Sequence, residues 1–168
     1  MGCSESRSNL TPEEAAIVKG ESIINIKRVV VEQAYLVMKR YGSSGTMTRS
    51  QLKEAARLLK VDMSGFRDPK SKVSRYFSGF KVAEAYSHEW MMVLALMLGA
   101  GSNREKATAF FNHMDKDFER TITPQKYGLL LKNMIKVGLT LNSTLGVGVE
   151  EEGFLTLDRM KAYTKNIE

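Results

Sequence analysis

Several residue types and patterns are scarce in this 168-residue chain, and each scarcity excludes something. The single cysteine, Cys3, rules out an internal disulfide and favours a reducing compartment. No basic segment followed by an apolar one opens the sequence, which argues against secretion. The longest apolar run, Trp90–Ala100, has 11 residues, whereas a membrane-spanning helix needs about 20. This run therefore predicts a buried helix.

Catalytic motifs are also missing. The sequence contains no P-loop, no G-x-S-x-G and no H-E-x-x-H. The only two histidines, His88 and His113, have no cysteine or second histidine at metal-ligand spacing, so we expect both at surface or loop positions. Gly99-Ala100-Gly101 ends a helical pattern and does not follow a strand, so it is no dinucleotide fingerprint. We expect a protein without enzymatic activity.

Positive charge is concentrated in the first half of the chain. The formal net charge is +6, with 15 Lys and Arg against 8 Asp and Glu in residues 1–81, and 10 against 11 in residues 82–168. A basic half favours an acidic partner, which is a nucleic acid, an anionic membrane or an acidic protein. At 43% hydrophobic residues, the chain has enough apolar material for a core.

The N-terminus carries a lipidation signal. Gly2 and Ser6 match the pattern M-G-x-x-x-[ST], which predicts N-myristoylation after removal of Met1. Cys3 lies beside this glycine, where a first acyl chain would bring its thiol to the bilayer for S-palmitoylation. Two acyl chains give stable anchoring and one does not. We expect residues 1–10 to be a disordered acylated tail at the cytoplasmic face of a plasma, flagellar or ciliary membrane. The alternative is an unmodified tail.

Helical periodicity and capping signals run through the rest of the chain, and no convincing strand pattern appears. Thr11-Pro12 and Thr123-Pro124 each start a helix, and Ser87 and Ser102 are predicted caps. The predicted helices are 12–40 with a break at Gly20, 48–60, 72–77, 88–98, 103–114, 124–138 and 158–165. The predicted fold class is all-α.

The segment 115–126 resembles an EF-hand loop, because acidic residues stand at loop positions 1, 3 and 5 between two predicted helices. These residues are Asp115, Asp117 and Glu119, and the aliphatic Ile122 stands at position 8. Weaker copies fit at 40–51, 78–89 and 148–159, with Met47, Ala85 and Leu155 at position 8.

The resemblance to the EF-hand superfamily implies four helix-loop-helix units in two lobes, with short β-bridges between paired loops. We expect the lobes to be residues 11–100 and 101–168. Such a calmodulin-like arrangement with N-terminal acylation is similar to recoverin-like sensors, calcineurin B-like proteins and calflagins.

Calcium ligands are largely missing from these loops. An EF-hand loop needs glycine at position 6 and a bidentate glutamate at position 12, where the best loop has Arg120 and Lys126. Its three acidic residues face three basic ones. We therefore expect no resident cofactor and at most weak Ca²⁺ binding. The candidate ligands are Asp115, Asp117, Glu119 and Thr121.

Ten methionines suggest how such a fold binds a target, because a Met-rich groove takes up an amphipathic helix. The candidate groove residues are Met91, Met92, Met97, Met114 and Met134. The alternative for each is core filling. The sequence thus predicts a membrane-tethered adaptor that binds a protein target helix.

Two other functions compete with the adaptor. One is a low-affinity calcium sensor or buffer that uses loop 115–126. The other is a basic binding module, whose patch would be Lys60, Arg67, Lys70, Lys72, Arg75 and Lys81, interleaved with Tyr76, Phe77 and Phe80. For this patch, a solvated face or lipid headgroups are favoured over nucleic acid.

Overall fold

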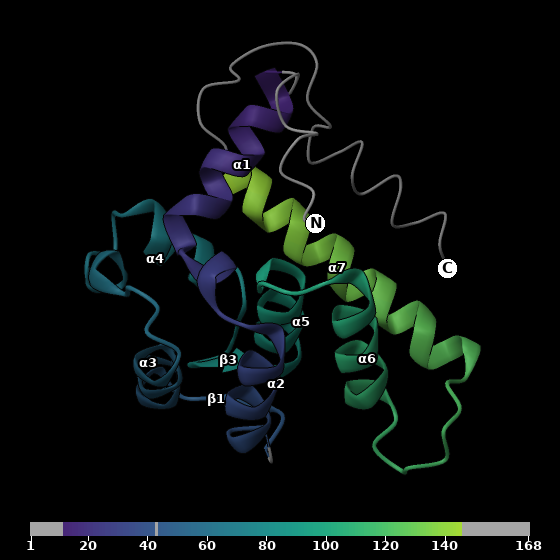
Figure 1. Ribbon diagram of the computed structural model, residues 1–168. Coiled ribbons are helices and arrows are strands. Elements are labelled where there is room, and N and C mark those ends of the chain that lie inside the picture. Colours follow the sequence, from purple (N-terminus) through teal and green to yellow (C-terminus); the bar gives the residue numbers. More distant parts are fainter. Residues whose placement is uncertain (1–11, 43, 146–168) are drawn as a thin grey trace.

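A computed structural model describes residues 12–42 and 44–145, which form seven α-helices, two 3₁₀ turns and a small sheet (Figure 1). The helices are α1 (Pro12–Ile24), α2 (Val31–Arg40), α3 (Arg49–Leu58), α4 (Lys72–Ser78), α5 (His88–Leu98), α6 (Asn103–Met114) and α7 (Pro124–Leu145). The 3₁₀ turns are η2 (Ile26–Arg28) and η3 (Ser64–Arg67), and the strands are β1 (Thr46–Met47), β2 (Lys81–Val82) and β3 (Ala85–Ser87). A mainly helical fold is confirmed. None of the described helices is both long and apolar enough to cross a bilayer.

Hydroxyl caps start the helices where the sequence predicts them. Ser87 Oγ accepts from the Trp90 backbone N–H at 3.3 Å and begins α5. Thr48 and Ser102 form complete capping boxes at the starts of α3 and α6. Each such cap satisfies a backbone donor without a helical partner and stabilises its helix by about 1 kcal/mol.

The predicted break in the first helix is in the wrong place. The chain remains helical through Gly20 and turns instead at Asn25, whose φ is +57°. Two hydrogen bonds then tie the following segment to the end of α5, from Val31 N to Ala100 O at 2.8 Å and from Ala100 N to Val29 O at 2.7 Å. These hydrogen bonds join residues that are far apart in the sequence, so no local pattern reveals them. They fix the position of the turn at Asn25.

Helix α5 forms the centre of the core. Each residue of the range 91–96 is at most 1% exposed, and α2, α6 and α7 all pack against the helix. Complete burial of an aliphatic side chain stabilises a fold by about 1.5–3 kcal/mol. The apolar run therefore forms the predicted buried helix, which is covered on every side.

Strand order in the sheet is β1-β3-β2, antiparallel throughout. Strand β1 joins the α2–α3 connection to the α4–α5 connection, and its Met47 pairs with Tyr86. The two position-8 residues, Met47 and Ala85, therefore do not pair with each other. Ala85 pairs instead with Val82 of β2, in a hairpin that the sequence does not predict.

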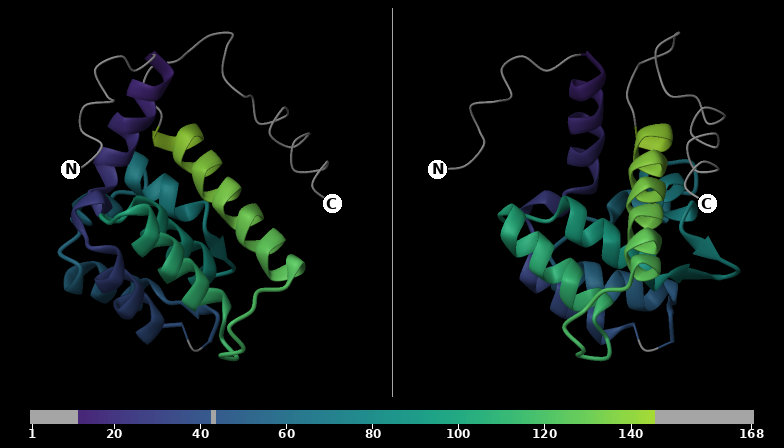
Figure 2. Two further views of the ribbon diagram at one scale, coloured as in Figure 1. Left: turned by 45° about the vertical axis from the view of Figure 1, so that its right-hand side comes forward. Right: turned by 90° about the vertical axis from the view of Figure 1, so that its right-hand side faces the viewer.

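Helix α7 crosses the fold and extends beyond its predicted end. It passes through Gly138 and continues to Leu145, packing against α1, α4 and α5. Both views of Figure 2 show it on the outside of the bundle, with its last turns near α1. Residues on both sides of the predicted boundary at 100–101 thus share one core, although the division into lobes stays a prediction. The predicted helix 158–165 and the loop 148–159 lie outside the described residues.

The path of α7 through Gly138 can be tested by substitution with alanine. A Cβ at Gly138 meets nothing within 4 Å, so Gly138→Ala should raise the free energy of unfolding by about 0.5–1 kcal/mol, measured by urea denaturation. Gly99→Ala is the control and should destabilise the fold, because its Cβ would lie 2.7 Å from Ala95 O. A loss of stability in Gly138→Ala would indicate that the helix ends at this residue.

Candidate functional site

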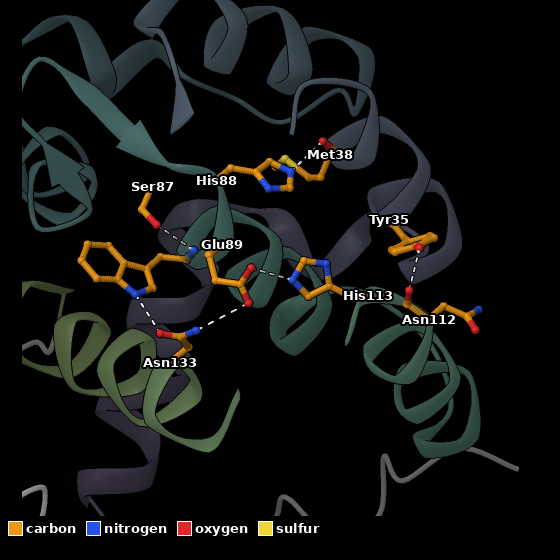
Figure 3. A network of polar contacts seen from close by, with 9 residues as sticks. Tyr35, Met38, Ser87, His88, Glu89, Asn112, His113 and Asn133 are labelled. Carbon is orange, nitrogen blue, oxygen red and sulfur yellow. Dashed lines mark hydrogen bonds and ion pairs between the residues drawn. The ribbon is translucent and has the colours of Figure 1, made fainter. Parts of the chain in front are cut away.

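A partly buried polar network joins the first turn of α5 to α6 and α7 (Figure 3). Trp90 Nε1 donates to Asn133 Oδ1 at 3.0 Å, and Asn133 Nδ2 lies 3.5 Å from Glu89 Oε1. The other carboxylate oxygen of Glu89 lies 2.9 Å from His113 Nε2. A carboxylate only accepts hydrogen bonds, so the histidine Nε2 donates. Three helices are thereby connected through satisfied polar groups.

His88 lies next to this network, on the same turn of α5. Its Nε2 donates to Met38 O at 2.9 Å, and its ring centroid is 6.4 Å from that of His113. Gly42 lies against the His88 ring so closely that a Cβ at Gly42 would be 2.4 Å from the ring Cε1. Both histidines are buried, so the expectation of surface or loop positions is wrong.

Burial and hydrogen bonding shift the ionisation of both acidic and basic groups here. The hydrogen bond from His113 holds the pKa of Glu89 below its ordinary value. Removal from water lowers the pKa of His88, because burial disfavours the charged imidazolium. Near neutral pH the site therefore combines an ionised glutamate with a neutral histidine.

The two histidines line one side of a pocket of about 690 Å³ between α2, α5 and α6. Tyr35 and Lys39 come from α2, and Lys116 and Phe118 come from the loop after α6. Its size lies in the range of small-molecule sites. Lys39 and Lys116 bring positive charge to its wall, and the Asp115 carboxylate accepts hydrogen bonds from its own loop.

That loop, the segment 115–123 between α6 and α7, is closed by its own side chains. Asp115 Oδ1 accepts from the Glu119 N–H at 2.9 Å, and Oδ2 accepts from the Arg120 N–H at 3.1 Å. Arg120 has φ +58°, the left-handed conformation that favours glycine. Asp115 thus stabilises a sharp turn at loop position 6.

A lysine from α7 compensates an acidic charge of this loop. Lys126 Nζ, from the first turn of α7, lies 3.1 Å from Asp117 Oδ2. Calcium requires six to eight oxygen ligands, and Lys126 supplies an ammonium where a bidentate glutamate would stand. Glu119 and Thr121, the other two candidate ligands, are exposed. The donor set therefore does not fit a calcium ion.

No three His, Cys, Asp or Glu side chains gather around a metal-sized space within residues 12–42 and 44–145. Weak calcium binding at loop 115–126 stays a prediction.

The methionines of the predicted groove separate into two groups. Met91 and Met92 are fully buried within α5, where they fill the core, as the alternative stated. Met97, Met114 and Met134 are partly buried and pack against that core.

The basic patch lies on several elements, and all six of its members are exposed. Its interleaved aromatic residues are not available for stacking on nucleobases, because Tyr76, Phe77 and Phe80 are at most 3% exposed. They pack on one another instead, with Tyr76 and Phe80 ring centroids 4.9 Å apart. Gly2 and Cys3, the predicted lipidation sites, lie outside the described residues.

The polar network itself was missed by sequence reasoning. Its hydrogen bonds from His113 and Asn133 to Glu89 span 24 and 44 residues, so no local motif connects them. The single tryptophan, beside an acidic residue at the start of the most apolar helix, is the one signal that could have drawn attention to it.

Comparisons of the chain with models of protein families, with curated proteins and with solved structures found no match.

The buried His88 should make stability depend on pH. Because its pKa is lower in the folded state, the unfolded state binds more protons between the folded pKa and 6.5. The free energy of unfolding should therefore fall as the pH is lowered from about 7 to about 5. Glu89 stays ionised over this range, because its pKa lies below 4.5. Guanidinium unfolding at a series of pH values measures the slope.

His88→Gln is the variant that isolates this effect, since glutamine retains a donor for Met38 O and does not titrate. The slope should be clearly shallower in His88→Gln than in the unmodified protein. Equal slopes in the two proteins would contradict the assignment.

Proposed function

We propose that this protein is a membrane-tethered, non-enzymatic adaptor of EF-hand-like architecture, which holds a helical target without calcium control. The observation that carries the proposal is the ion pair between Lys126 and Asp117. In this EF-hand-like loop, the ammonium group of Lys126 takes the place that a calcium ion would have beside Asp117.

The pairing of helices supports an EF-hand-like first lobe. Helices α2 and α3 flank one loop, α4 and α5 flank another, and β1 pairs with β3 between the two loops. The short antiparallel bridge resembles the one expected between paired EF-hand loops. The hairpin of β2 and β3 is a departure from that pattern.

The third loop supports the same architecture through its turn. An EF-hand loop places glycine at position 6 for a sharp turn, and here Arg120 at that position takes up the left-handed conformation. Asp115 at position 1 binds the backbone of positions 5 and 6. The loop therefore keeps a tight turn at position 6 although it has lost the calcium ligands.

Exposed apolar side chains near this loop support a protein target. Phe118 is 82% exposed, and Tyr127 and Leu131 lie four residues apart on α7, where residues at this spacing share one helix face. An amphipathic target helix buries such side chains when it docks.

The tether depends on Gly2, Cys3 and the basic first half of the chain. Two acyl chains give stable anchoring, and basic side chains near an anionic surface add roughly 1 kcal/mol each. A low-affinity calcium sensor that uses loop 115–126 is the competing function, and calcium titration separates the two.

Calorimetric titration of the full chain should show no Ca²⁺ binding at micromolar concentrations. The double variant Arg120→Gly/Lys126→Glu restores the glycine and the bidentate carboxylate, so it should bind Ca²⁺ with a dissociation constant on the order of 10⁻⁴–10⁻³ M. Arg120→Gly/Lys126→Gln is the matched control and should bind none, because it removes the ammonium without adding a ligand. Micromolar binding by the unmodified protein would contradict calcium independence and favour the sensor.

Removal of the acylatable glycine should release the protein from membranes. Gly2→Ala prevents myristoylation, and without the first acyl chain palmitoylation of Cys3 is not favoured, so fractionation of expressing cells should find the variant in the supernatant. Cys3→Ser keeps one acyl chain and should be distributed between the two fractions, since one chain binds only marginally. A Gly2→Ala variant that remains on membranes would refute the lipid anchor.

A further inference from the structure

A second pocket, of about 550 Å³, lies between α3 and the segment 61–67 that includes η3. Three basic side chains line it, namely Lys53 and Arg57 from α3 and Arg67 from η3. The two arginines and the lysine come from elements on opposite sides of the pocket. Three basic side chains thus border one open pocket.

Two of these cations have no carboxylate partner among the described residues. Arg57 binds Glu54 through two hydrogen bonds of 2.7 and 2.8 Å, whereas Lys53 and Arg67 form no ion pair there. The one carboxylate in the pocket wall, Asp62, is committed to its own turn, because its two oxygens accept from the N–H and the Oγ of Ser64. With Asp62 and Glu54 counted against the three basic side chains, one positive charge at the pocket is left without a compensating carboxylate.

The walls of the pocket are fixed before any ligand arrives. Arg49 donates to Phe66 O at 3.1 Å, and its guanidinium lies 5.0 Å from the centroid of the Phe66 ring. Phe66 is 2% exposed and packs edge-on against Phe77. These contacts hold η3 against α3, so the core fixes the backbone positions from which the three basic side chains extend.

The chemistry of the pocket favours a phosphomonoester. A guanidinium presents paired donors that match phosphate oxygens, and an ammonium adds a compact positive charge. Val61 and Met63 are half-buried in the pocket wall and offer apolar contact to the carbon skeleton that carries the phosphate. The volume of about 550 Å³ fits a single phosphorylated ring.

We propose that this pocket, formed by Lys53, Arg57 and Arg67, binds a phosphomonoester group carried by an inositol headgroup or by a free phosphorylated metabolite. Only Arg67 belongs to the predicted basic patch. The proposal goes beyond the adaptor function and does not depend on acylation.

The test uses the full chain without acyl groups at about 0.15 M salt, where exposed charges are screened beyond about 8 Å. Inositol 1,4,5-trisphosphate and inorganic phosphate are titrated by calorimetry. Vesicles that carry phosphatidylinositol 4-phosphate are compared by co-sedimentation with charge-matched vesicles that carry phosphatidylserine. Binding to inositol trisphosphate and preference for phosphoinositide vesicles support a lipid source. Binding to the soluble probes without vesicle preference supports a free metabolite.

Lys53→Gln/Arg67→Gln should weaken binding of inositol trisphosphate at least about tenfold, because it removes the two unpaired charge-assisted donors. Lys72→Gln/Arg75→Gln removes the same charge from exposed positions of α4 and should change the affinity less than about twofold. Thermal melting confirms that both variants are folded. Equal losses in the two variants, or no binding of any probe by the unmodified protein, would overturn the proposal. Either result leaves the anchor intact, because the assay contains no acyl chain.

Discussion

The burial of residues 91–96 of α5 is the constraint on which the rest of the structure depends. A helix that is apolar on all sides has no face for water, so α2, α6 and α7 must surround it. Its first turn nevertheless carries the buried His88 and the partly buried Glu89 and Trp90. Each of these polar groups needs a partner, and the partners come from the surrounding helices. The packing around α5 and the hydrogen bonds of its first turn therefore favour the same arrangement of α2, α6 and α7.

Hydrogen bonds and an ion pair within the chain hold several loops of the described residues. Between the first two helix pairs, β1 and β3 exchange backbone hydrogen bonds. After α6, Asp115 caps the turn and Lys126 binds Asp117. An exposed ion pair contributes at most about 1 kcal/mol. The loop geometry therefore depends mainly on the backbone hydrogen bonds to the buried Asp115 carboxylate.

Much of the helical structure was predictable, because the signals that start a helix are local. Ser87, Ser102 and Thr48 lie within three residues of the backbone donors they bind. Helix ends were less predictable. Glycine permits a turn without requiring one, and packing of α7 against α1 and α4 keeps the chain helical beyond Gly138.

Features formed between distant residues escaped sequence reasoning. The β2–β3 hairpin turns at Ala83, whose φ is +54°, where the usual signal would be glycine or asparagine. Lys53 and Arg57 belong to the polar face of an amphipathic helix, which is the ordinary place for solvated charges. Only the position of η3 turns these two residues into the wall of a pocket.

Lys126 differs from a bound metal ion in one way that matters in the cell, because it is part of the polypeptide chain. A metal ion exchanges with its surroundings, so the shape of a loop that binds it reports the ion's concentration. Lys126 is present at a constant stoichiometry of one per loop, and neither a chelator nor an ion transient removes it. On the proposal that this loop binds no calcium, the geometry between α6 and α7 is the same in a resting cell and in a stimulated one. Regulation of the proposed adaptor then acts through its surfaces and not through this loop.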